Sequence, residues 1–510
     1  MYNTMLMEQD NVANHEGARA YAMTPELELY TAVMTAALSD NFYESKDERV
    51  NRIAELVDKV SPEFVAKLAV YTRTVMNLRT IPMLLLVELA RVHNGDDLVA
   101  RAVEQTVQRA DEIMELLMCY QWRNPSADPR KKLGKLSRQI QNGLQRAFNR
   151  FDEYQFAKYN RGNLKVKLRD ALFLTHPKAK DEGQQHLFDK IVSGTLETPY
   201  TWETELTALG QRQFGSEEER REAVRTKWEE LIDSGKLGYM ALMRNLRNML
   251  QAGVQFPAML KVAGRLSDPE QVEKSRQLPF RFLSAYREVS GVESPMTNMV
   301  LNALETAVRH TAANIEGFGP DTRVLIASDV SGSMHFPVSR NSTVMNYDIG
   351  LLLSMLLKSR CRQVVSGIFG SDWKVVNMPS DNILSSTLQL HKLSNSVGFG
   401  TNAFNVFDWL IVNSVETGEI VDKVFFFTDM QMWDLTGDNR SLLKMWGKYK
   451  KKSPGAKLYL FDLAGYGQMP LRLVRPDIWL VAGWNERVFG VLEAIEKGED
   501  AIDVINKIEI

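Results

Sequence analysis

The sequence is poor in cysteine and histidine, and this scarcity excludes several kinds of site. Its 510 residues include two cysteines, Cys119 and Cys361, and seven histidines. Two cysteines so far apart in the sequence have the spacing of neither a disulfide framework nor a zinc site. The histidines form no His-Glu-x-x-His motif, and no Gly-x-Ser-x-Gly motif is present. The sequence therefore predicts neither a zinc protease nor a serine hydrolase, and it favours a reducing compartment.

Long hydrophobic runs are also missing. No segment reaches the roughly 18 uninterrupted apolar residues that a membrane-spanning helix needs. The best candidate, residues 81–90, is short and contains Glu88. The first residues carry Glu8, Asp10 and Glu16 and have no apolar core, so we expect no secretory signal. The expected location is the cytoplasm, with no membrane partner.

Charge is balanced over the whole chain but not within one segment. The formal net charge is −2, and the hydrophobic content of 44% and charged content of 25% are ordinary for globular proteins. A chain of this length predicts two domains or more. Residues 130–180 contain 14 Lys or Arg against three acids, Asp152, Glu153 and Asp170. This basic block indicates either a polyanion-binding site or a solvated basic helix face, and charge alone does not separate the two.

Residues 24–315 have an almost wholly helical pattern. Apolar residues recur three and four positions apart, for example in the segment 53–60. Two helix starts are marked by proline directly after a capping residue, at Thr24-Pro25 and at Ser61-Pro62. Loops are short and clear strand runs are missing. About a dozen helices over this length predict stacked antiparallel pairs, as in helical-repeat proteins.

The pattern changes after the turn-rich segment 317–321. Short β-branched or apolar runs then alternate with helical patterns, which predicts a parallel sheet covered by helices on both faces. In such a sheet the ligand crevice lies outside the carboxyl ends of the strands. The expected strands are 322–328, 363–369, 423–428, 457–463 and 478–482, and the expected helices are 343–358, 402–412, 440–449 and 486–495.

Oxygen-bearing side chains follow the expected strand ends. Asp329, Ser331 and Ser333 form an Asp-x-Ser-x-Ser motif directly after the first strand, Thr401 opens a helix, and Asp429 follows the third strand. Two carboxylates and three hydroxyls are hard ligands that suit Mg²⁺ or Mn²⁺. Because the hydroxyls are neutral, the ion keeps positive charge and can accept an outside carboxylate or phosphate. A nucleotide-binding domain with ordinary helix caps is the alternative, but no Gly-rich loop with Lys is present.

This set resembles the metal-ion-dependent adhesion site of von Willebrand factor type A domains. The resemblance covers residues 318–510 and implies that the five residues above are the metal ligands. One departure concerns the second loop, which often reads Gly-Gly-Thr in related domains. Here Phe399 separates Gly398 from Gly400, which makes Thr401 the least typical of the five.

Three segments of the helical region carry a second resemblance. Residues 154–180, 237–250 and 278–286, in this order and before a type A domain, resemble the TROVE module of the Ro autoantigen family. The resemblance implies a HEAT-like ring or solenoid of helical repeats over residues 1–315, followed by an α/β doubly wound, Rossmann-like domain over 318–510. It also implies a non-catalytic protein that binds small noncoding, Y-like RNA and the ends of misfolded RNA in RNA quality control. An exoribonuclease is a candidate protein partner, and no DNA partner is expected.

The basic block lies where the first of these segments lies, and phosphate contacts need such a density of Lys and Arg. Aromatic side chains in the same part of the chain could stack on unpaired bases. For Phe156 and Phe173, however, the helical spacing favours packing in the core. The other aromatic candidates are Tyr154, Tyr159 and Trp202. The candidate RNA-binding residues are Lys165, Lys167, Arg169, His176 and Lys178, together with Arg244 and Arg247, which are expected on one helix.

Three functions remain open at this point. The leading hypothesis is an RNA-binding scaffold, which the basic block favours. The alternative is a protein-interaction module in a multiprotein complex without RNA, in which the metal site binds an acidic residue of a partner. A metal-dependent phosphoryl hydrolase is disfavoured because no nucleophile or base is identifiable; His335, just past the metal loop, is more typical of a loop residue.

Overall fold

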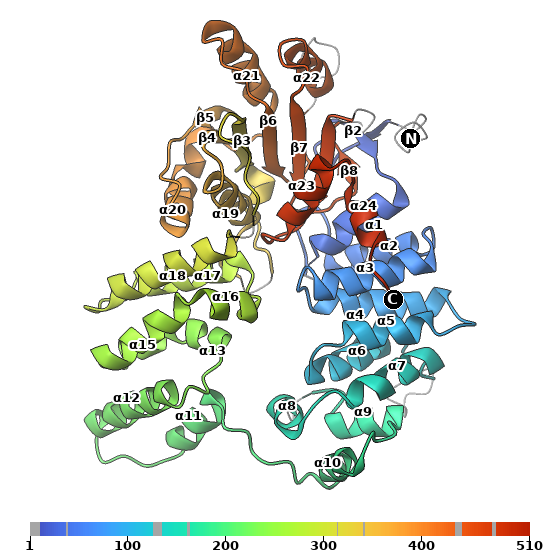
Figure 1. The fold of residues 1–510 in the computed structure, drawn as a ribbon, viewed down its shortest axis with the longest axis vertical. Coiled ribbons are helices and arrows are strands. Elements are labelled where there is room, and N and C mark those ends of the chain that lie inside the picture. The colour runs from blue at the N-terminus through green and yellow to red at the C-terminus, as the bar shows by residue number, and fades with distance from the viewer. Residues whose placement is uncertain are drawn as a thin grey trace. The chain divides into compact units, whose positions relative to one another are not determined.

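The computed structural model describes residues 11–36, 39–125, 135–160, 164–313, 315–339, 342–433, 441–471 and 476–510. A long helical region is followed by a sheet with helices around it (Figure 1). This confirms the predicted fold class. Within the described residues, every helix is too short or too polar to span a lipid bilayer.

The helical region extends to residue 311, and helices close in sequence pack on one another, as α3 does on α4 and α17 on α18. Its helices are α1 (Pro25–Met34), α2 (Lys46–Val57), α3 (Pro62–Thr74), α4 (Thr80–Val92), α5 (Leu98–Thr106), α6 (Ala110–Arg123), α7 (Arg138–Phe148), α8 (Glu153–Tyr159), α9 (Leu168–Thr175), α10 (Glu182–Ser193), α11 (Trp202–Gly210), α12 (Glu217–Asp233), α13 (Tyr239–Arg244), α14 (Leu246–Gln251), α15 (Phe256–Leu266), α16 (Pro269–Ser275), α17 (Pro279–Ser290) and α18 (Thr297–Thr311).

The two proline-marked helix starts are present in the structure. The Thr24 hydroxyl accepts a hydrogen bond from the Leu27 amide at 3.3 Å, and the Ser61 hydroxyl accepts one from the Phe64 amide at 3.2 Å. Each cap satisfies an amide that has no partner inside its helix. The proline that follows each cap costs no hydrogen bond at that position.

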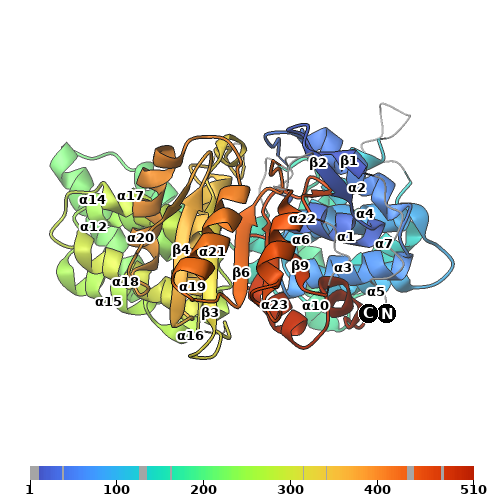
Figure 2. The same ribbon diagram turned by 90° about the horizontal axis from the view of Figure 1, so that it is seen from above.

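The large sheet has the strand order β5-β4-β3-β6-β7-β9, and only β5 runs antiparallel to its neighbour. In Figure 2 the labels β4, β6 and β9 follow one another across the view in this order. The strands are β3 (Arg323–Asp329), β4 (Gln363–Phe369), β5 (Trp373–Val375), β6 (Lys423–Thr428), β7 (Lys457–Asp462) and β9 (Ile478–Ala482), and the helices are α19 (Asn346–Lys358), α20 (Ile383–Leu393), α21 (Phe404–Glu416), α22 (Leu442–Lys450), α23 (Val488–Glu496) and α24 (Ala501–Asn506). The five predicted strands all form, whereas β5, α20 and α24 were not predicted.

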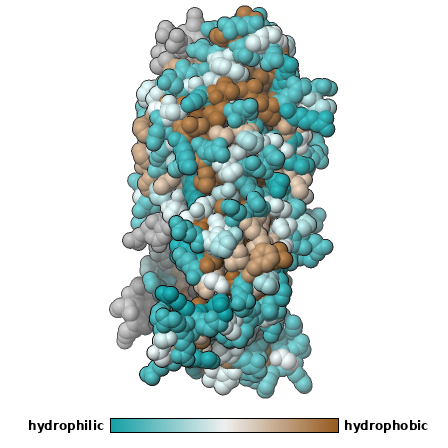
Figure 3. All heavy atoms as spheres, turned by 90° about the vertical axis from the view of Figure 1, so that its left-hand side faces the viewer, coloured by the Kyte–Doolittle hydropathy of each residue, from teal (hydrophilic) through white to brown (hydrophobic). Residues whose placement is uncertain are grey.

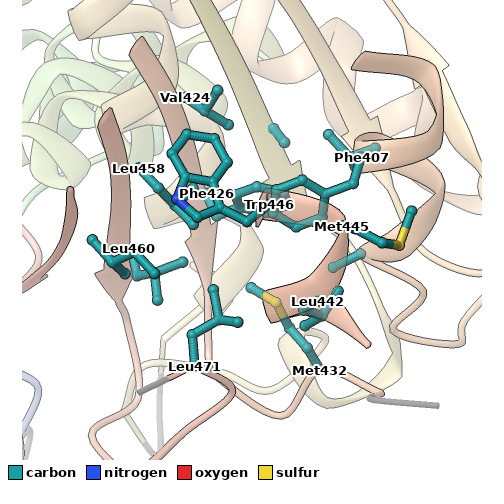
Figure 4. Packing of buried hydrophobic residues seen from close by; sticks show 14 of the residues in the cluster. Phe407, Val424, Phe426, Met432, Leu442, Met445, Trp446, Leu458, Leu460 and Leu471 are labelled. Carbon is teal, nitrogen blue, oxygen red and sulfur yellow. The ribbon is translucent and has the colours of Figure 1, made fainter. Parts of the chain in front are cut away.

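Both faces of this sheet are buried, which explains the continuous apolar runs in its strands. On one face Phe426 packs between Phe407 of α21 and the core residues of α22, with ring centroids 5.3 Å apart for the two phenylalanines (Figure 4). On the other face Phe461 lies against Phe489 of α23, with centroids 5.8 Å apart. A doubly covered sheet of this kind holds its strand ends in fixed positions, and the candidate metal ligands follow those ends.

A small antiparallel sheet joins the beginning of the chain to the α/β domain. Its strands β1 (Asn11–Ala13), β2 (Arg19–Ala22) and β8 (Gln468–Met469) pair in the order β1-β2-β8. The sequence analysis did not predict this sheet, because its strands are only two to four residues long. The pairing places the turn between β1 and β2 within the α/β domain.

The chain divides into two compact units. One comprises residues 1–52 and 238–504, and the other comprises 53–237 and 505–510. In the first unit the Glu305 carboxylate of α18 accepts hydrogen bonds from the Leu384 and Ser385 amides at the start of α20, at 3.0 and 2.7 Å. The last helices of the helical region, α17 and α18, therefore pack against α19 and α20 of the α/β domain. The domain division predicted from the sequence, 1–315 and 318–510, stays a prediction.

Figure 3 shows one face of the molecule, on which patches of hydrophobic residues lie between hydrophilic ones. The exposed large hydrophobic side chains include Phe256 and Leu260 on α15 and Val412 and Val415 on α21. Scattered exposure of this kind is normal for a globular protein and by itself identifies no partner.

Candidate functional site

The two candidate carboxylate ligands follow neighbouring strands. Asp329 is the last residue of β3, and Asp429 directly follows β6. The strands are parallel and paired, with Ser328 opposite Phe427, so their carboxyl ends lie side by side. Both aspartates are fully buried. The predicted convergence of the strand ends is thus present in the structure.

Hydrogen bonds hold the first carboxylate in place. Asp329 Oδ1 accepts from the Ser331 amide at 2.9 Å, and Oδ2 accepts from the Thr428 hydroxyl at 2.7 Å. The Asp429 carboxylate accepts from the Gln431 amide at 3.0 Å through Oδ1. Asp429 Oδ2 and Ser331 Oγ are buried, and among the described residues no group forms a hydrogen bond of good geometry with either atom, although the Ser331 and Ser333 hydroxyls lie near the two carboxylates. Buried oxygens without partners are costly, and a cation that binds to them would remove this cost.

The electrostatics of the site also suit a cation. Burial raises the pKa of Asp329 to about 6, and the Ser331 and Thr428 hydroxyls oppose the rise. Burial raises the pKa of Asp429 to about 7, the adjacent Asp329 raises it further, and the Ser333 hydroxyl lowers it. Two neighbouring carboxylates that are shielded from water tend to take up a proton unless a cation balances their charge. A divalent ion would supply that charge.

Thr401 lies in a loop that forms backbone hydrogen bonds with the segment after Asp329 and with the segment after Asp429. The Gly332 amide donates to the Phe399 carbonyl at 2.9 Å, and the Trp433 amide donates to the Thr401 carbonyl at 3.1 Å. Thr401 is buried, whereas the Phe399 side chain is 59% exposed. The additional residue between the two glycines is therefore accommodated by turning its side chain to solvent. Gly398 has a φ of 73°, and a Cβ there would lie 2.7 Å from Ser371 Oγ.

The candidate donor set combines carboxylates with hydroxyls. The described residues include no group of three or more His, Cys, Asp or Glu side chains that could hold a metal. The candidate site has two carboxylates, and the hydroxyls of Ser331 and Ser333 lie in the same network. Oxygen donors of this kind fit Mg²⁺ or Mn²⁺ and do not fit a soft metal. The structure thus brings together Asp329, Ser331, Ser333 and Asp429 and places Thr401 in the adjoining loop.

The second candidate site surrounds α9. Side chains that were predicted to bind RNA are exposed on this helix and on the segments beside it, and they are Lys165, Lys167, Arg169, His176 and Lys178. His176 ends α9 in the left-handed conformation, with a φ of 50°. The opposite face of α9 is buried through Leu168, Ala171, Leu172 and Thr175. One short helix therefore presents a basic surface to solvent while its other face anchors it.

Phe173 lies on the exposed side of α9, and the prediction that it packs in the core is wrong. Its side chain is 47% exposed, and the guanidinium carbon of Arg169 lies 5.6 Å from the ring centroid. Phe173 comes four positions after Arg169 and therefore shares its side of the helix, opposite the buried Leu168, Ala171, Leu172 and Thr175. Phe156 is fully buried, which confirms the prediction for that ring.

Comparison with known proteins places the chain in a family. The TROVE domain model matches residues 27–227 and 194–318, which together are more than half of the chain. The chain belongs to the TROVE family. This relation supports an RNA-binding role as part of a ribonucleoprotein. The crystal structure of the Deinococcus radiodurans Ro (RSR) protein is similar in fold, with a TM-score of 0.56 and 18% identity, and the similarity covers 93% of this chain and all of that one.

Two curated relatives are similar over shorter segments. Telomerase protein component 1 of Rattus norvegicus is 25% identical over an alignment of 324 residues, and the match covers 48% of this chain. Its counterpart in Mus musculus is 39% identical over 101 residues, which are 20% of this chain. The matched segments amount to only 12% and 3% of these relatives' own lengths.

Two further candidate residues of this TROVE chain do not share one helix as predicted. The helix ends at Arg244, and a new one begins at Leu246, because Asn245 between them has a φ of −104° and a ψ of 7°. Arg244 and Arg247 are both exposed, and Arg247 forms an ion pair with Glu288 at 2.6 Å. They belong to the compact unit that holds the sheet, whereas α9 belongs to the other. The predicted set is thus divided between the two units.

Other aromatic residues of the basic block have cationic neighbours. The ammonium nitrogen of Lys158 lies 5.6 Å from the Tyr154 ring centroid, and the guanidinium carbon of Arg109 lies 4.6 Å from that of Tyr159. Tyr154 is 46% exposed. Trp202 instead stacks on another tryptophan, which indicates a structural role. Four basic residues of the block, Arg130, Lys131, Lys132 and Arg161, lie outside the described residues.

Sequence reasoning missed three residues near the metal site. Asp462 ends β7, the next strand along, and its charge adds to the rise in the pKa of Asp429. An aspartate at a strand end was a signal that could have identified it. Glu16 and Tyr43 come from the beginning of the chain, and no local pattern marked them. His335 Nε2 donates a hydrogen bond to the Val330 carbonyl at 3.1 Å, which fits a role within the loop.

Proposed function

We propose that this protein binds small noncoding, Y-like RNA and the single-stranded ends of misfolded RNA, as a non-catalytic scaffold. The observation that carries the proposal is the exposed pair of Arg169 and Phe173, with exposed Lys167 and Lys178 at the two ends of α9. Cationic side chains can contact phosphates, and an exposed ring beside them can stack on an unpaired base. This combination suits RNA with unpaired nucleotides better than it suits a regular duplex.

The rest of the α9 surface supports the same function. Gln145 donates to the carbonyls of Thr175 and His176, at 2.7 and 3.2 Å, and Asn149 donates to the Lys178 carbonyl at 2.8 Å. These bonds from α7 fix the backbone that carries the basic side chains. Because this backbone is already fixed, RNA binding needs to order fewer groups, and its entropic cost is lower. The setting we propose is cytoplasmic RNA quality control, with an exoribonuclease as a candidate partner.

The test compares RNAs of equal charge. A stem with a single-stranded 3′ tail and a blunt duplex with the same number of phosphates compete for the full chain in fluorescence anisotropy. The tailed RNA should win, and Phe173→Ala should weaken its binding by about fivefold to 100-fold, the range of one lost stacking contact. Binding of the blunt duplex should change little.

Phe256→Ala is the matched control, because Phe256 is an exposed aromatic residue on α15. It should leave the competition as in the unmodified chain. Equal competition by the two RNAs, or equal effects of the two variants, would contradict a site on α9. The names of the rat and mouse relatives also make a telomerase complex a candidate setting, which co-purification from cell extract with sequencing of bound RNA would test.

We also propose that the site at the ends of β3 and β6 binds Mg²⁺ or Mn²⁺. Asp329, Ser331, Ser333, Thr401 and Asp429 would hold the ion, and its positive charge would attract a carboxylate. The unpartnered oxygens of Ser331 and Asp429 support this assignment. A function in protein interaction, without RNA, is the second candidate, and the buried oxygens of this site are the observation that favours it.

A further inference from the structure

The turn between β1 and β2 lies on the segment that directly follows Asp429. Three successive residues of the turn bond to three successive residues of that segment. Asn14 Nδ2 donates to the Met432 carbonyl at 2.9 Å, and the His15 amide donates to Gln431 Oε1 at 2.7 Å. Trp433 Nε1 donates to Glu16 Oε2 at 3.4 Å. The turn is thereby held beside the candidate metal site.

Tyr43 connects the same turn to a candidate metal ligand. Its hydroxyl donates a hydrogen bond to the Glu16 carboxylate, and the Ser333 hydroxyl lies within hydrogen-bonding reach of it. The Tyr43 ring stacks on His15, with centroids 4.9 Å apart and an angle of 7° between the planes. Tyr466 packs edge-on against both rings. A chain of contacts therefore runs from Glu16 through Tyr43 to Ser333.

The charged groups in this arrangement indicate its function. The Tyr43 hydroxyl donates a hydrogen bond to Glu16 and so holds that carboxylate in place. The Glu16 carboxylate is exposed, and the Tyr43 side chain that binds it also lies near Ser333 and the buried Asp429. Without a cation these carboxylates repel one another. A bound cation would attract all of them.

We propose that Glu16 is the metal site's own carboxylate partner, held by Tyr43 and Trp433, so that the β1–β2 turn covers the site and competes with outside acidic ligands. This inference rests on the proposed binding of Mg²⁺ or Mn²⁺ at the five ligand positions. It gives the metal site a role within the chain, because a bound ion fastens the turn to the α/β domain. An outside carboxylate must displace the turn before it reaches the ion.

The first experiment measures Mn²⁺ binding to the full chain by calorimetry, with water proton relaxation to count the exchangeable waters on the bound ion. Glu16→Gln removes the charge and keeps the shape of the side chain. It should weaken Mn²⁺ binding by about tenfold and increase the number of exchangeable waters. Tyr43→Phe should act in the same direction, because it removes the hydroxyl that holds Glu16.

Asp47→Asn is the matched control, because Asp47 is an exposed carboxylate on α2 in the same compact unit. It should bind Mn²⁺ as the unmodified chain does. Acetate provides the second readout, as a simple outside carboxylate. It should displace water from Mn²⁺ bound to Glu16→Gln at lower concentration than from Mn²⁺ bound to the unmodified chain.

Hydrogen exchange of residues 12–21 gives a readout that does not depend on affinity. Mn²⁺ should slow exchange of this segment in the unmodified chain and in Asp47→Asn, and much less in Glu16→Gln. If Glu16→Gln matches the unmodified chain in affinity, hydration and exchange, the inference is overturned while the metal site stands. If the unmodified chain binds no Mn²⁺, the proposed metal site is overturned, and the inference with it.

Discussion

The two candidate sites of this chain use charge in opposite ways. Around α9, cationic side chains such as Lys167 and Arg169 are exposed and separate, and each can contact one phosphate. At the ends of β3 and β6, Asp329 and Asp429 are fully buried and act on each other. The first arrangement predicts many weak contacts with RNA, which salt weakens by screening. The second predicts a single metal-binding centre, in which the loss of one carboxylate removes most of the binding. The experiments below test this difference, from the largest expected effect to the smallest.

The largest effect should come from salt. If RNA binding at α9 involves four to six phosphate contacts, affinity should fall by roughly 50- to 2,000-fold between 50 and 200 mM salt. Replacing Lys167, Arg169 and Lys178 together by alanine should lower both the affinity and the slope of log K against log salt. The slope should decrease by about 0.7–0.9 for each contact removed. Anisotropy titrations at several salt concentrations measure both quantities.

Three exposed lysines of the α/β domain, Lys444, Lys451 and Lys452, provide the control for this experiment. Lys450 is unsuitable, because it forms an ion pair with Asp477 at 3.2 Å. The control variant should keep most of the affinity and the slope. If the two triple variants behave alike, RNA binds to general positive charge and the comparison between the two sites fails.

The next effect concerns the metal site. Asp329→Ala should weaken Mn²⁺ binding by about 100-fold, since it removes one of two carboxylate ligands. The fold should survive with a loss of about 1–3 kcal/mol, because the Thr428 hydroxyl loses its buried acceptor. Calorimetry and thermal unfolding measure the two effects. RNA affinity of the same variant should stay unchanged, and a parallel loss would show that the two sites are coupled.

A smaller effect should appear in the dependence of stability on pH. Burial raises the pKa of Glu486 to about 7 in the folded chain, and the Arg487 charge opposes the rise. The folded state then binds the proton more tightly than the unfolded state does, so stability falls as pH rises from about 4.5 to 7. Glu486→Gln should raise the free energy of unfolding at pH 8 by about 1–3 kcal/mol and change it little at pH 4. Denaturant unfolding at both pH values tests this; an equal change at both would contradict it.

The smallest expected effect is none at all. Incubation of the protein with labelled RNA and Mg²⁺ or Mn²⁺ should give no cleavage, because no nucleophile or general base was identified beside Asp429. Gel analysis of the RNA over hours gives the result. Cleavage that disappears in Asp429→Ala would show that the site at β3 and β6 is catalytic. The comparison between an RNA-binding surface at α9 and a metal-binding centre at β3 and β6 would then fail.

The residues at the strand ends of the candidate metal site were predictable, and the position of Glu16 near them was not. Asp329, Ser331, Ser333 and Asp429 follow strands whose apolar runs are visible in the sequence, and the parallel pairing of β3 and β6 aligns the strand ends. Glu16 reaches the same place through a two- to four-residue strand pairing that local periodicity does not reveal. A contact between residues 417 positions apart depends on packing of the whole unit.

The helical region shows the same limit at single residues. Helical periodicity alone identified Phe156 as a core residue correctly, but it assigned Phe173 to the core as well. It also extended one helix across Asn245, where the backbone leaves the helical conformation.

What the amino-acid sequence by itself determined was the order of helices and strands, the ligand types at the strand ends and the basic block. These follow from hydrophobic periodicity, capping and composition, which act over a few residues. Only the tertiary structure decided which face of α9 is exposed, that Phe173 lies beside Arg169 on that face, and that Glu16 and Tyr43 lie beside the candidate metal site. Burial depends on which elements pack together, and the free energy of that packing is shared among residues that are distant in the chain.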